Sequence, residues 1–257
     1  MRVQRLAQNI GGYKGETIDI KTVLADIDTL ASKTGWRPEP IIVSEALTIP
    51  AYHRPSATSQ KHIYISAGIH GDEPAGPLAA LKLFQDNRWP EQLNLWLIPC
   101  LNPTGFAHNR RGNDDGVDLN RDYRSFSTST VRAHKAWLEA RPRFAVGVCL
   151  HEDWESNGFY LYELNPDLQA SISDTVIREV SRVCPIDLSP EIEGRKAQNG
   201  VICANPDLLK RPDWPEAFYL IHNKTRLNYT LEAPSDFPLP TRIHALATAV
   251  EAILETV

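Results

Sequence analysis

A run of seven mostly apolar residues, 144–150, constrains the fold of this chain more than any other segment. The run reads Phe-Ala-Val-Gly-Val-Cys-Leu, carries no charge and leads directly into His151. A near-continuous apolar run is typical of a strand that is buried on both faces, as in parallel sheets covered by helices. The sequence therefore predicts a sheet that is enclosed by helices rather than one with an exposed face.

Further strand patterns alternate with helical patterns along the chain. The expected strands are residues 41–49, 62–67, 93–98, 144–150, 158–164 and 227–231, and the expected helices are residues 18–33, a helix with Pro74 in its first turn, 168–183 and 240–255. This alternation predicts an α/β fold with a largely parallel or mixed sheet. No repeat of 20–50 residues and no Gly/Ser-rich or charged linker divides the sequence, so we expect one domain over residues 1–257.

Composition and charge exclude several classes of function. The chain has 32 acidic residues against 27 Lys and Arg, so it lacks the basic footprint of a nucleic-acid-binding protein. No apolar run approaches the roughly 20 residues of a membrane-crossing helix, and residues 1–8 lack the apolar core of a secretory signal. The four cysteines form no CxxC pair and are too sparse for a disulfide scaffold. We expect a reduced, soluble, cytoplasmic protein without nucleic-acid or membrane partners, and the sequence leaves its oligomeric state open.

Active sites of α/β sheets lie beyond the carboxyl ends of the strands, so polar residues that follow apolar strand runs are the candidates for chemistry. Four places in this chain satisfy that rule. They are residues 70–73, residues 102–123, His151-Glu152 and Glu232.

His70 and Glu73 offer an imidazole and a carboxylate three residues apart, with Gly68 and Gly71 to let the backbone turn sharply. Zinc prefers such donors, and a catalytic site uses three protein ligands and one open position. His151 follows a buried strand as His70 does, so the two imidazoles can converge at one sheet edge. The alternatives are a helix start with Glu73 in its first turn, and a buried His151 satisfied by hydrogen bonds. The other histidines are expected on the surface or as caps: His53, His62, His108, His134, His222 and His244.

Residues 102–123 are too rich in Gly, Asn and Asp for a helix or a regular strand and predict a long structured loop, which is usually functional. Its three arginines suit capture of a carboxylate or stabilisation of an oxyanion. The alternative is a solvated loop whose Arg and Asp side chains pair with each other. Glu232, at a strand end, could accept a proton from metal-bound water, or it could be an ordinary polar strand terminus.

Together these segments resemble the zinc carboxypeptidase family, of which carboxypeptidase A is the familiar member. The matching residues, in chain order, are His70-Gly-Asp-Glu73, Asn102-Pro-Thr-Gly-Phe106, Arg111, Gly116-Val-Asp-Leu-Asn-Arg121, His151, and Glu232 within Thr-Leu-Glu-Ala-Pro-Ser. They lie between residues 63 and 240, and the Gly-Val-Asp-Leu-Asn-Arg string is the most specific of them. The segment around Glu232 and the short chain are more similar to bacterial murein peptide amidases than to digestive carboxypeptidases.

The resemblance implies a fold, an activity and a set of residue roles. The fold would be a twisted mixed sheet of about eight strands between helices. His70, Glu73 and His151 would bind one Zn²⁺, Glu232 would be the general base and Arg111 would polarise the scissile carbonyl. Asn120 and Arg121 would hold the free carboxylate of a peptide or acyl-amino acid substrate. The activity would be that of a metallocarboxypeptidase or peptide amidase, in which a zinc-bound water cleaves the amide bond next to a C-terminal residue.

Two other functions are compatible with the same motifs, and several residues depart from the family pattern. The related N-acyl amino acid amidohydrolases, such as succinylglutamate desuccinylase and aspartoacylase, share the zinc triad, and a non-catalytic binding protein could keep the fold. Asp122 stands where many carboxypeptidases have Asn, and it could weaken carboxylate binding or hold Arg121 in place. Glu152 and Glu155 predict an acidic rim, and residues 185–215, which include Arg195 and Lys196, predict a wall of the specificity pocket. Tyr219 is not a secure match to the substrate-capping tyrosine of the family.

Overall fold

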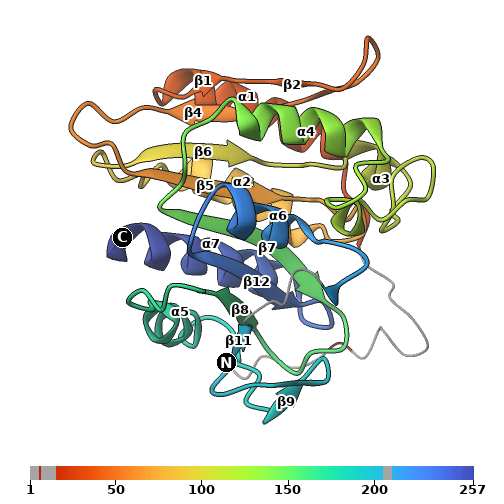
Figure 1. Cartoon of the computed structure of the whole chain (residues 1–257). Helices are drawn as coiled ribbons and strands as arrows, with labels where there is room; N and C mark the ends of the chain where they lie inside the picture. The colour runs from red at the N-terminus through yellow and green to blue at the C-terminus, as the bar shows by residue number, and fades with distance from the viewer. Residues whose placement is uncertain (1–5, 7–15, 205–209) are drawn as a thin grey trace.

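A mixed eight-stranded sheet forms the centre of the computed structural model, which describes residues 6, 16–204 and 210–257 (Figure 1). Its strand order is β1-β4-β6-β5-β7-β12-β8-β11. The strands are β1 (Arg37–Pro38), β4 (Tyr52–Arg54), β5 (His62–Ala67), β6 (Asn94–Ile98), β7 (Val146–Asp153), β8 (Tyr160–Leu164), β11 (Val201–Ala204) and β12 (Asn228–Pro234). This architecture confirms the predicted fold class.

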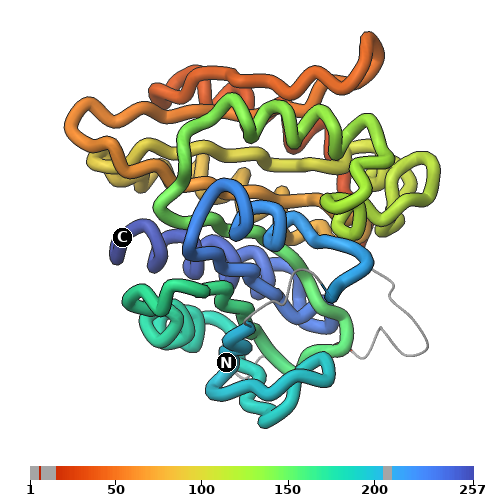
Figure 2. Tube along the Cα trace, in the orientation of Figure 1, coloured from red at the N-terminus to blue at the C-terminus, as the bar shows by residue number. Residues whose placement is uncertain are grey.

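The four central strands β6, β5, β7 and β12 run parallel, so their carboxyl ends meet at one edge of the sheet. The outer strands β1, β4 and β8 pair antiparallel with their inner neighbours. All eight residues of β7 are buried. The apolar run predicts this for residues 146–150, whereas Phe144 and the exposed Ala145 precede the strand. In the trace of Figure 2, the yellow-green segment 102–123 gathers at the same edge as these strand ends.

Helices cover both faces of the sheet (Figure 1). One face packs against α1 (Ile20–Lys33), α2 (Ala75–Asp86), α5 (Ser173–Val180) and α7 (Leu239–Thr256). The other face packs against α4 (Ser129–Glu139) and α6 (Glu216–Asn223). Two smaller hairpin pairs, β2 (Ile41–Ile42) with β3 (Thr48–Ile49) and β9 (Glu191–Ile192) with β10 (Arg195–Lys196), stand outside the main sheet. Among the described residues, no helix is both long and apolar enough to cross a membrane.

Most elements with a strong pattern form where the sequence predicts them. The strand over 62–67 and the helices over 18–33 and 240–255 are confirmed to within one or two residues, and α2 begins directly after Pro74. All four cysteines lie in the described residues and are free. Of the N-terminal segment 1–8, in which we expect no secretory signal, all residues but Leu6 lie outside the described residues.

Two predicted elements differ in form or extent from the structure. The single strand expected over 41–49 is a hairpin, because the Ser44 hydroxyl accepts the backbone N–H groups of Ala46 and Leu47 and so reverses the chain. The helix expected over 168–183 forms only over Ser173–Val180, since the Asn165 side chain closes a turn around Gln169 before it.

The stretch 102–123 is not free of helix: it contains α3 (Pro103–Ala107) and a 3-10 turn, η1 (Leu119–Arg121). The side chains of Asn102 and Asp118 cap these two turns by accepting the N–H of Gly105 and Asn120. Local caps thus stabilise helical turns that the average composition of the stretch hides.

Strands β7 and β12 run further than the apolar patterns indicate. The patterns end at residues 150 and 231, but the ladder continues to Asp153 and Pro234. His151 and Glu232 therefore lie near the carboxyl ends of two paired strands, not in the loops that follow them. Strands hold side chains in a defined register, so both residues have fixed positions at the sheet edge.

Candidate metal centre and substrate cavity

The turn that joins β5 to α2 brings His70 and Glu73 to the edge of the sheet. Gly68 adopts a φ of +63°, which an L side chain rarely tolerates. Gly71 is required for a different reason, because a Cβ there would lie 2.1 Å from the carbonyl carbon of Gly105. Both glycines thus serve the sharp turn, one through its backbone conformation and the other through close packing.

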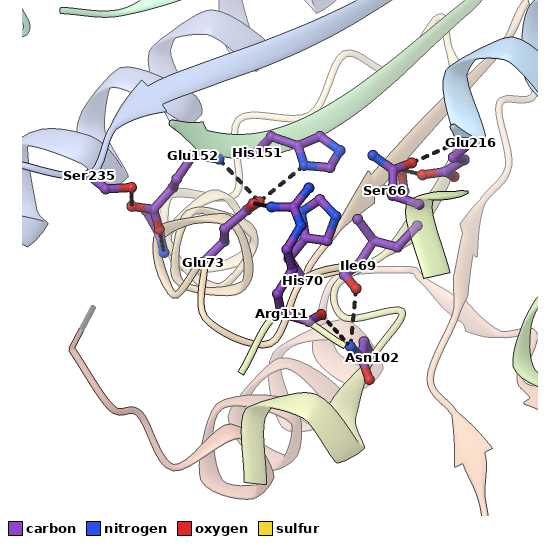
Figure 3. Close-up of polar contacts among 12 residues, drawn as sticks. Ser66, Ile69, His70, Glu73, Asn102, Arg111, His151, Glu152, Glu216 and Ser235 are labelled. Carbon is purple, nitrogen blue, oxygen red and sulfur yellow. Dashed lines mark hydrogen bonds and ion pairs between the residues drawn. The ribbon is translucent and has the colours of Figure 1, made fainter. Parts of the chain in front are cut away.

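Asn102 holds the same turn from the side of the polar stretch. Its Nδ2 donates to the backbone carbonyls of Ile69 and Arg111, at 3.2 Å each (Figure 3). One buried side chain therefore fixes the residue before His70 together with the main chain of Arg111. This contact gives the Asn102–Phe106 segment a structural role next to the cluster.

His70, Glu73 and His151 converge although 78 residues separate Glu73 from His151 (Figure 3). The Nδ1 of His70 lies 2.6 Å from Oε1 of Glu73, and Nδ1 of His151 lies 3.0 Å from Oε2. All three side chains are buried, and one ligand atom from each lies within 4.8 Å of the others. Two imidazole nitrogens and one carboxylate form the donor set that a catalytic zinc ion uses. The residues present therefore fit a divalent metal such as zinc.

Asp118, for which the sequence motifs predict no role of its own, completes the surroundings of His70. Its Oδ1 lies 3.2 Å from Nε2 of His70, and its Oδ2 accepts Nε of Arg111 at 2.9 Å. Burial raises the pKa of Asp118, but the contacts with His70 and Arg111 outweigh burial and lower that pKa below its usual value. An ionised Asp118 would fix the orientation of the imidazole and leave Nδ1 for the metal. Its place in the Gly116–Arg121 string was the available signal.

Arg111, Asn120 and Arg121 line the same cavity as the cluster, which has a volume of about 800 Å³. Arg111 lies 3.4 Å from Glu73 through Nη1 and also pairs with Asp118, so it belongs both to the cavity and to an Arg–Asp pair of the loop. The Oδ1 atom of Asn120 accepts the backbone N–H of Glu216 at 2.8 Å. Arg121 donates to the carbonyl of Asn120 and lies 3.5 Å from Asp213.

Asp122 contacts its own turn and not Arg121, which it was expected either to hold in place or to weaken as a carboxylate-binding group. Its carboxylate is buried and accepts hydrogen bonds from Ser125, Ser127 and Thr128, in the turn that leads to α4. The acid that contacts Arg121 is Asp213. The charge of Asp122 is thus taken up by its own turn.

Glu232 lies next to the cluster because β12 pairs with β7 in a register that sets it opposite His151. Its side chain is half-buried and lines the cavity. Burial, followed by the charges of Glu73, Asp153 and Glu193, raises the pKa of Glu232 well above its ordinary value in the metal-free protein. A divalent cation at the cluster would favour the ionised carboxylate and oppose that shift.

Both acids of the predicted acidic rim, Glu152 and Glu155, line the cavity, but of the two only Glu155 is exposed. Glu152 forms an ion pair with Arg242 of α7, in which both side chains are fully buried, and accepts Ser235 Oγ at 3.2 Å. Its other carboxylate oxygen accepts the N–H of Ala75 at 2.6 Å. Glu152 thus caps the first turn of α2, although it is 77 residues away in the sequence. Glu152 is thus a structural acid, whose backbone N–H also donates to Glu73 (Figure 3).

The segment expected to wall the specificity pocket contributes to the cavity in its described parts, and residues 205–209 lie outside them. Glu193, Arg195 and Pro215 are among its lining residues, whereas Lys196 is an exposed residue of β10. Tyr219 is buried against Tyr123 and Phe126, so it cannot cap the cavity in this structure.

Known proteins match this chain in part of its sequence and over most of its fold. A family model described as "Protein of unknown function (DUF2817)" matches residues 43–143. The carboxypeptidase SOL1 of Arabidopsis thaliana is 41% identical over 66 residues, a match that covers 21% of this chain and only 13% of that protein.

Solved structures match nearly the whole chain. Two of them, from Shewanella baltica OS155 and Shewanella amazonensis SB2B, are each described as a "putative metallopeptidase". They share 24% and 22% identity with this chain at TM-scores of 0.79 and 0.78, over 92% of both chains in each case. A metallo-carboxypeptidase from Pseudomonas aeruginosa, in complex with (2-guanidinoethylmercapto)succinic acid, shares 15% identity at a TM-score of 0.72, over 94% of this chain and 69% of its own. The resemblance indicated by the sequence motifs is thereby confirmed at the level of structure: this chain has a zinc carboxypeptidase-like fold.

Proposed function

We propose that this protein is a zinc-dependent hydrolase that cleaves the amide bond next to a C-terminal residue, as a metallocarboxypeptidase or peptide amidase. The observation that carries the proposal is the content of one cavity. It is lined by the donors His70, Glu73 and His151, by Glu232 and by a pair of carboxylate-binding candidates, Asn120 and Arg121.

The residues of the cavity divide the work of amide hydrolysis among them. A zinc ion, when bound, supplies a Lewis acid that lowers the pKa of water towards about 7. Arg121 and the Nδ2 group of Asn120 bind the terminal carboxylate of the substrate, which fixes the peptide bond in the cavity and makes the attack an oriented one. Arg111 faces the developing oxyanion. Glu232 accepts a proton from the attacking water and returns it to the leaving amine.

A substrate panel with matched pairs tests this proposal. The metal-loaded protein is incubated with peptides that have a free C-terminus, with the same peptides as C-terminal amides, and with N-acyl amino acids, and one of the peptides is a cell-wall peptide. We expect release of C-terminal residues from the free peptides and little release from the amides, because the amides lack the charge that Arg121 binds.

The other outcomes of the panel assign the alternatives. Turnover confined to N-acyl amino acids would replace the proposal with an N-acyl amino acid amidohydrolase. Stoichiometric zinc without turnover of any substrate on the panel would indicate a binding protein that keeps the fold.

A further inference from the structure

Glu216, the first residue of α6, is a buried acid that the proposed mechanism does not use. Its side chain is 1% exposed and accepts two hydroxyl groups, Tyr64 Oη at 2.6 Å and Ser66 Oγ at 2.9 Å. Its backbone N–H donates to Oδ1 of Asn120 at 2.8 Å. Figure 3 shows Glu216 with Ser66 in the same view as the metal cluster. One residue thus connects the central sheet to a residue of the substrate cavity.

Two hydroxyl groups of the central sheet bind the carboxylate of Glu216. Tyr64 and Ser66 are two residues apart on β5, so their side chains point to the same face. Strand β5 continues through the Gly68 turn to His70. The carboxylate of Glu216 therefore rests on the strand that delivers a candidate metal ligand.

Hydrogen bonds, not a cation, stabilise this buried acid. Within residues 6, 16–204 and 210–257, no Lys or Arg forms an ion pair with it. A buried carboxylate without a cation is costly unless hydrogen bonds satisfy it, and here they come from Tyr64 and Ser66.

The hydrogen bond from Tyr64 to Glu216 also sets the direction of the hydrogen bonds next to it. Because Tyr64 Oη donates to Glu216, Nε2 of His134, 3.0 Å away, must donate to Tyr64. Nδ1 of His134 then accepts Tyr123 Oη at 2.6 Å. His134 is fully buried in this chain of contacts, so its expected place on the surface or as a cap is wrong. This series of hydrogen bonds leads from Tyr123, two residues after Arg121, through His134 and Tyr64 to Glu216.

The bond from Glu216 decides which end of the Asn120 side chain faces the cavity. A backbone N–H can only donate, so it must meet the oxygen of the amide and not its nitrogen. With Oδ1 held there, Asn120 has only its Nδ2 donors left for a ligand in the cavity that it lines. A donor of this kind recognises a carboxylate and rejects an ammonium group.

We propose that Glu216 is a positioning residue for recognition of the substrate carboxylate: it anchors the first turn of α6 on the sheet and thereby holds the Asn120 amide with its NH₂ group towards the substrate. Glu216 itself touches no substrate. The inference rests on the proposed function, because it assumes that Asn120 and Arg121 bind a terminal carboxylate.

The test compares Glu216→Ala with wild type and with Arg121→Met, on the panel peptide that wild type cleaves fastest and on its C-terminal amide. For Glu216→Ala we expect KM for the free peptide to rise about tenfold or more, with kcat within about threefold, since one positioned hydrogen bond to a charged group is lost. KM for the amide should not change. Glu216→Gln, which keeps one acceptor oxygen, should have a KM for the free peptide between those of wild type and Glu216→Ala.

Glu163→Ala is the matched control. Glu163 is also a buried acid that accepts serine hydroxyls, those of Ser171 and Ser173, but it does not line the cavity. It should leave KM unchanged. If Glu216→Ala does not fold, Tyr64→Phe removes one donor to the carboxylate and should raise KM in the same selective way.

The possible failures are distinguishable. If wild type cleaves peptides and Arg121→Met raises KM but Glu216→Ala and Tyr64→Phe do not, the positioning role is overturned and the proposed function stands. An equal rise of KM for the peptide and its amide would likewise overturn the positioning role. If wild type cleaves nothing on the panel, the proposed function itself fails.

Discussion

Glu232 on β12 is the direct register partner of His151 on β7, so a candidate base and a candidate metal ligand stand side by side on adjacent parallel strands. Paired residues of neighbouring strands project to the same face of a sheet. The separation of the two groups is therefore set by the rigid ladder of the sheet. This arrangement satisfies a requirement of proton transfer, which needs a base held within reach of the water it activates.

Replacing Glu232 with Gln should abolish most of the turnover and leave the metal in place. The substitution keeps the shape of the side chain but removes its basicity, and a general base contributes about 10²- to 10⁴-fold to rate. We expect kcat to fall by at least about 10²-fold at an unchanged zinc content. Glu139→Gln, an exposed acid on α4, is the control. Undiminished kcat in Glu232→Gln would exclude Glu232 as the base.

Replacing His151 with Ala should abolish stoichiometric zinc binding, because a catalytic zinc site uses three protein ligands and the variant keeps only two. Zinc per chain, measured by elemental analysis after dialysis against a weak chelator, should fall from about one to near zero. His108→Ala should retain zinc, since His108 is exposed and its imidazole lies beside Asp114, which is not one of the candidate ligands. In wild type, zinc should raise Tm, because a ligand that binds the folded state stabilises it. Full zinc content in His151→Ala would remove this residue from the ligand set.

Replacing Asp118 with Asn should weaken zinc binding about 10- to 100-fold without removing any metal ligand. The carboxylate at 3.2 Å from Nε2 of His70 is lost as a charged partner, so the imidazole becomes less basic and less well oriented. Competition with a fluorescent zinc chelator would measure the change. Asp114→Asn, in the same loop but exposed, should not alter the affinity. Equal affinities of the two variants would contradict the role given to Asp118.

Replacing Arg242 with Met should destabilise the protein by about 3–5 kcal/mol, because it leaves the buried Glu152 without its cation. Urea unfolding of the metal-free protein measures the difference. Arg226→Met, which breaks an exposed pair with Asp167, should cost far less, because solvent screens that pair. Adding Glu152→Gln to Arg242→Met should recover part of the loss. A loss no larger than that of Arg226→Met would show that the pair contributes little.

Stability should depend on pH through Glu216. Burial raises the pKa of this carboxyl from 4.5 to about 7. The hydrogen bonds from Tyr64, Ser66 and Cys149 and the charge of His70 lower the pKa, but they do not offset burial. The folded state therefore favours the protonated form, and that stability is complete below about pH 4.5 and is lost as pH rises to about 7.

Relative to Glu216→Gln, which does not titrate, wild type should thus lose at most about 3 kcal/mol of unfolding free energy between pH 4.5 and 7 and nothing further above pH 7. Urea unfolding at several pH values checks this. A constant difference between the two proteins from pH 4.5 to 8 would show that the carboxyl titrates alike in the folded and unfolded states.

The sequence indicated which side chains gather at the carboxyl ends of the strands better than it indicated the bounds of the elements around them. His70, His151 and Glu232 follow runs of apolar residues, so their positions at strand ends could be read locally. Helices α4 and α6 were not predicted. The acids Asp118 and Glu216 gained a role only from tertiary partners such as His70 and Tyr64. The Glu216–Asn120 contact joins residues 96 positions apart, and the Glu152–Arg242 pair joins residues 90 positions apart.

By itself, the sequence determined which segments become buried strands and which chemical groups stand at their ends, because burial and strand formation follow from apolar patterns a few residues long. The tertiary structure alone decided how those groups combine: it set Glu232 opposite His151, turned Glu152 inward to Arg242 and directed the amide of Asn120. These outcomes depend on strand register and on packing between distant segments, and neither is encoded in any local stretch of the chain.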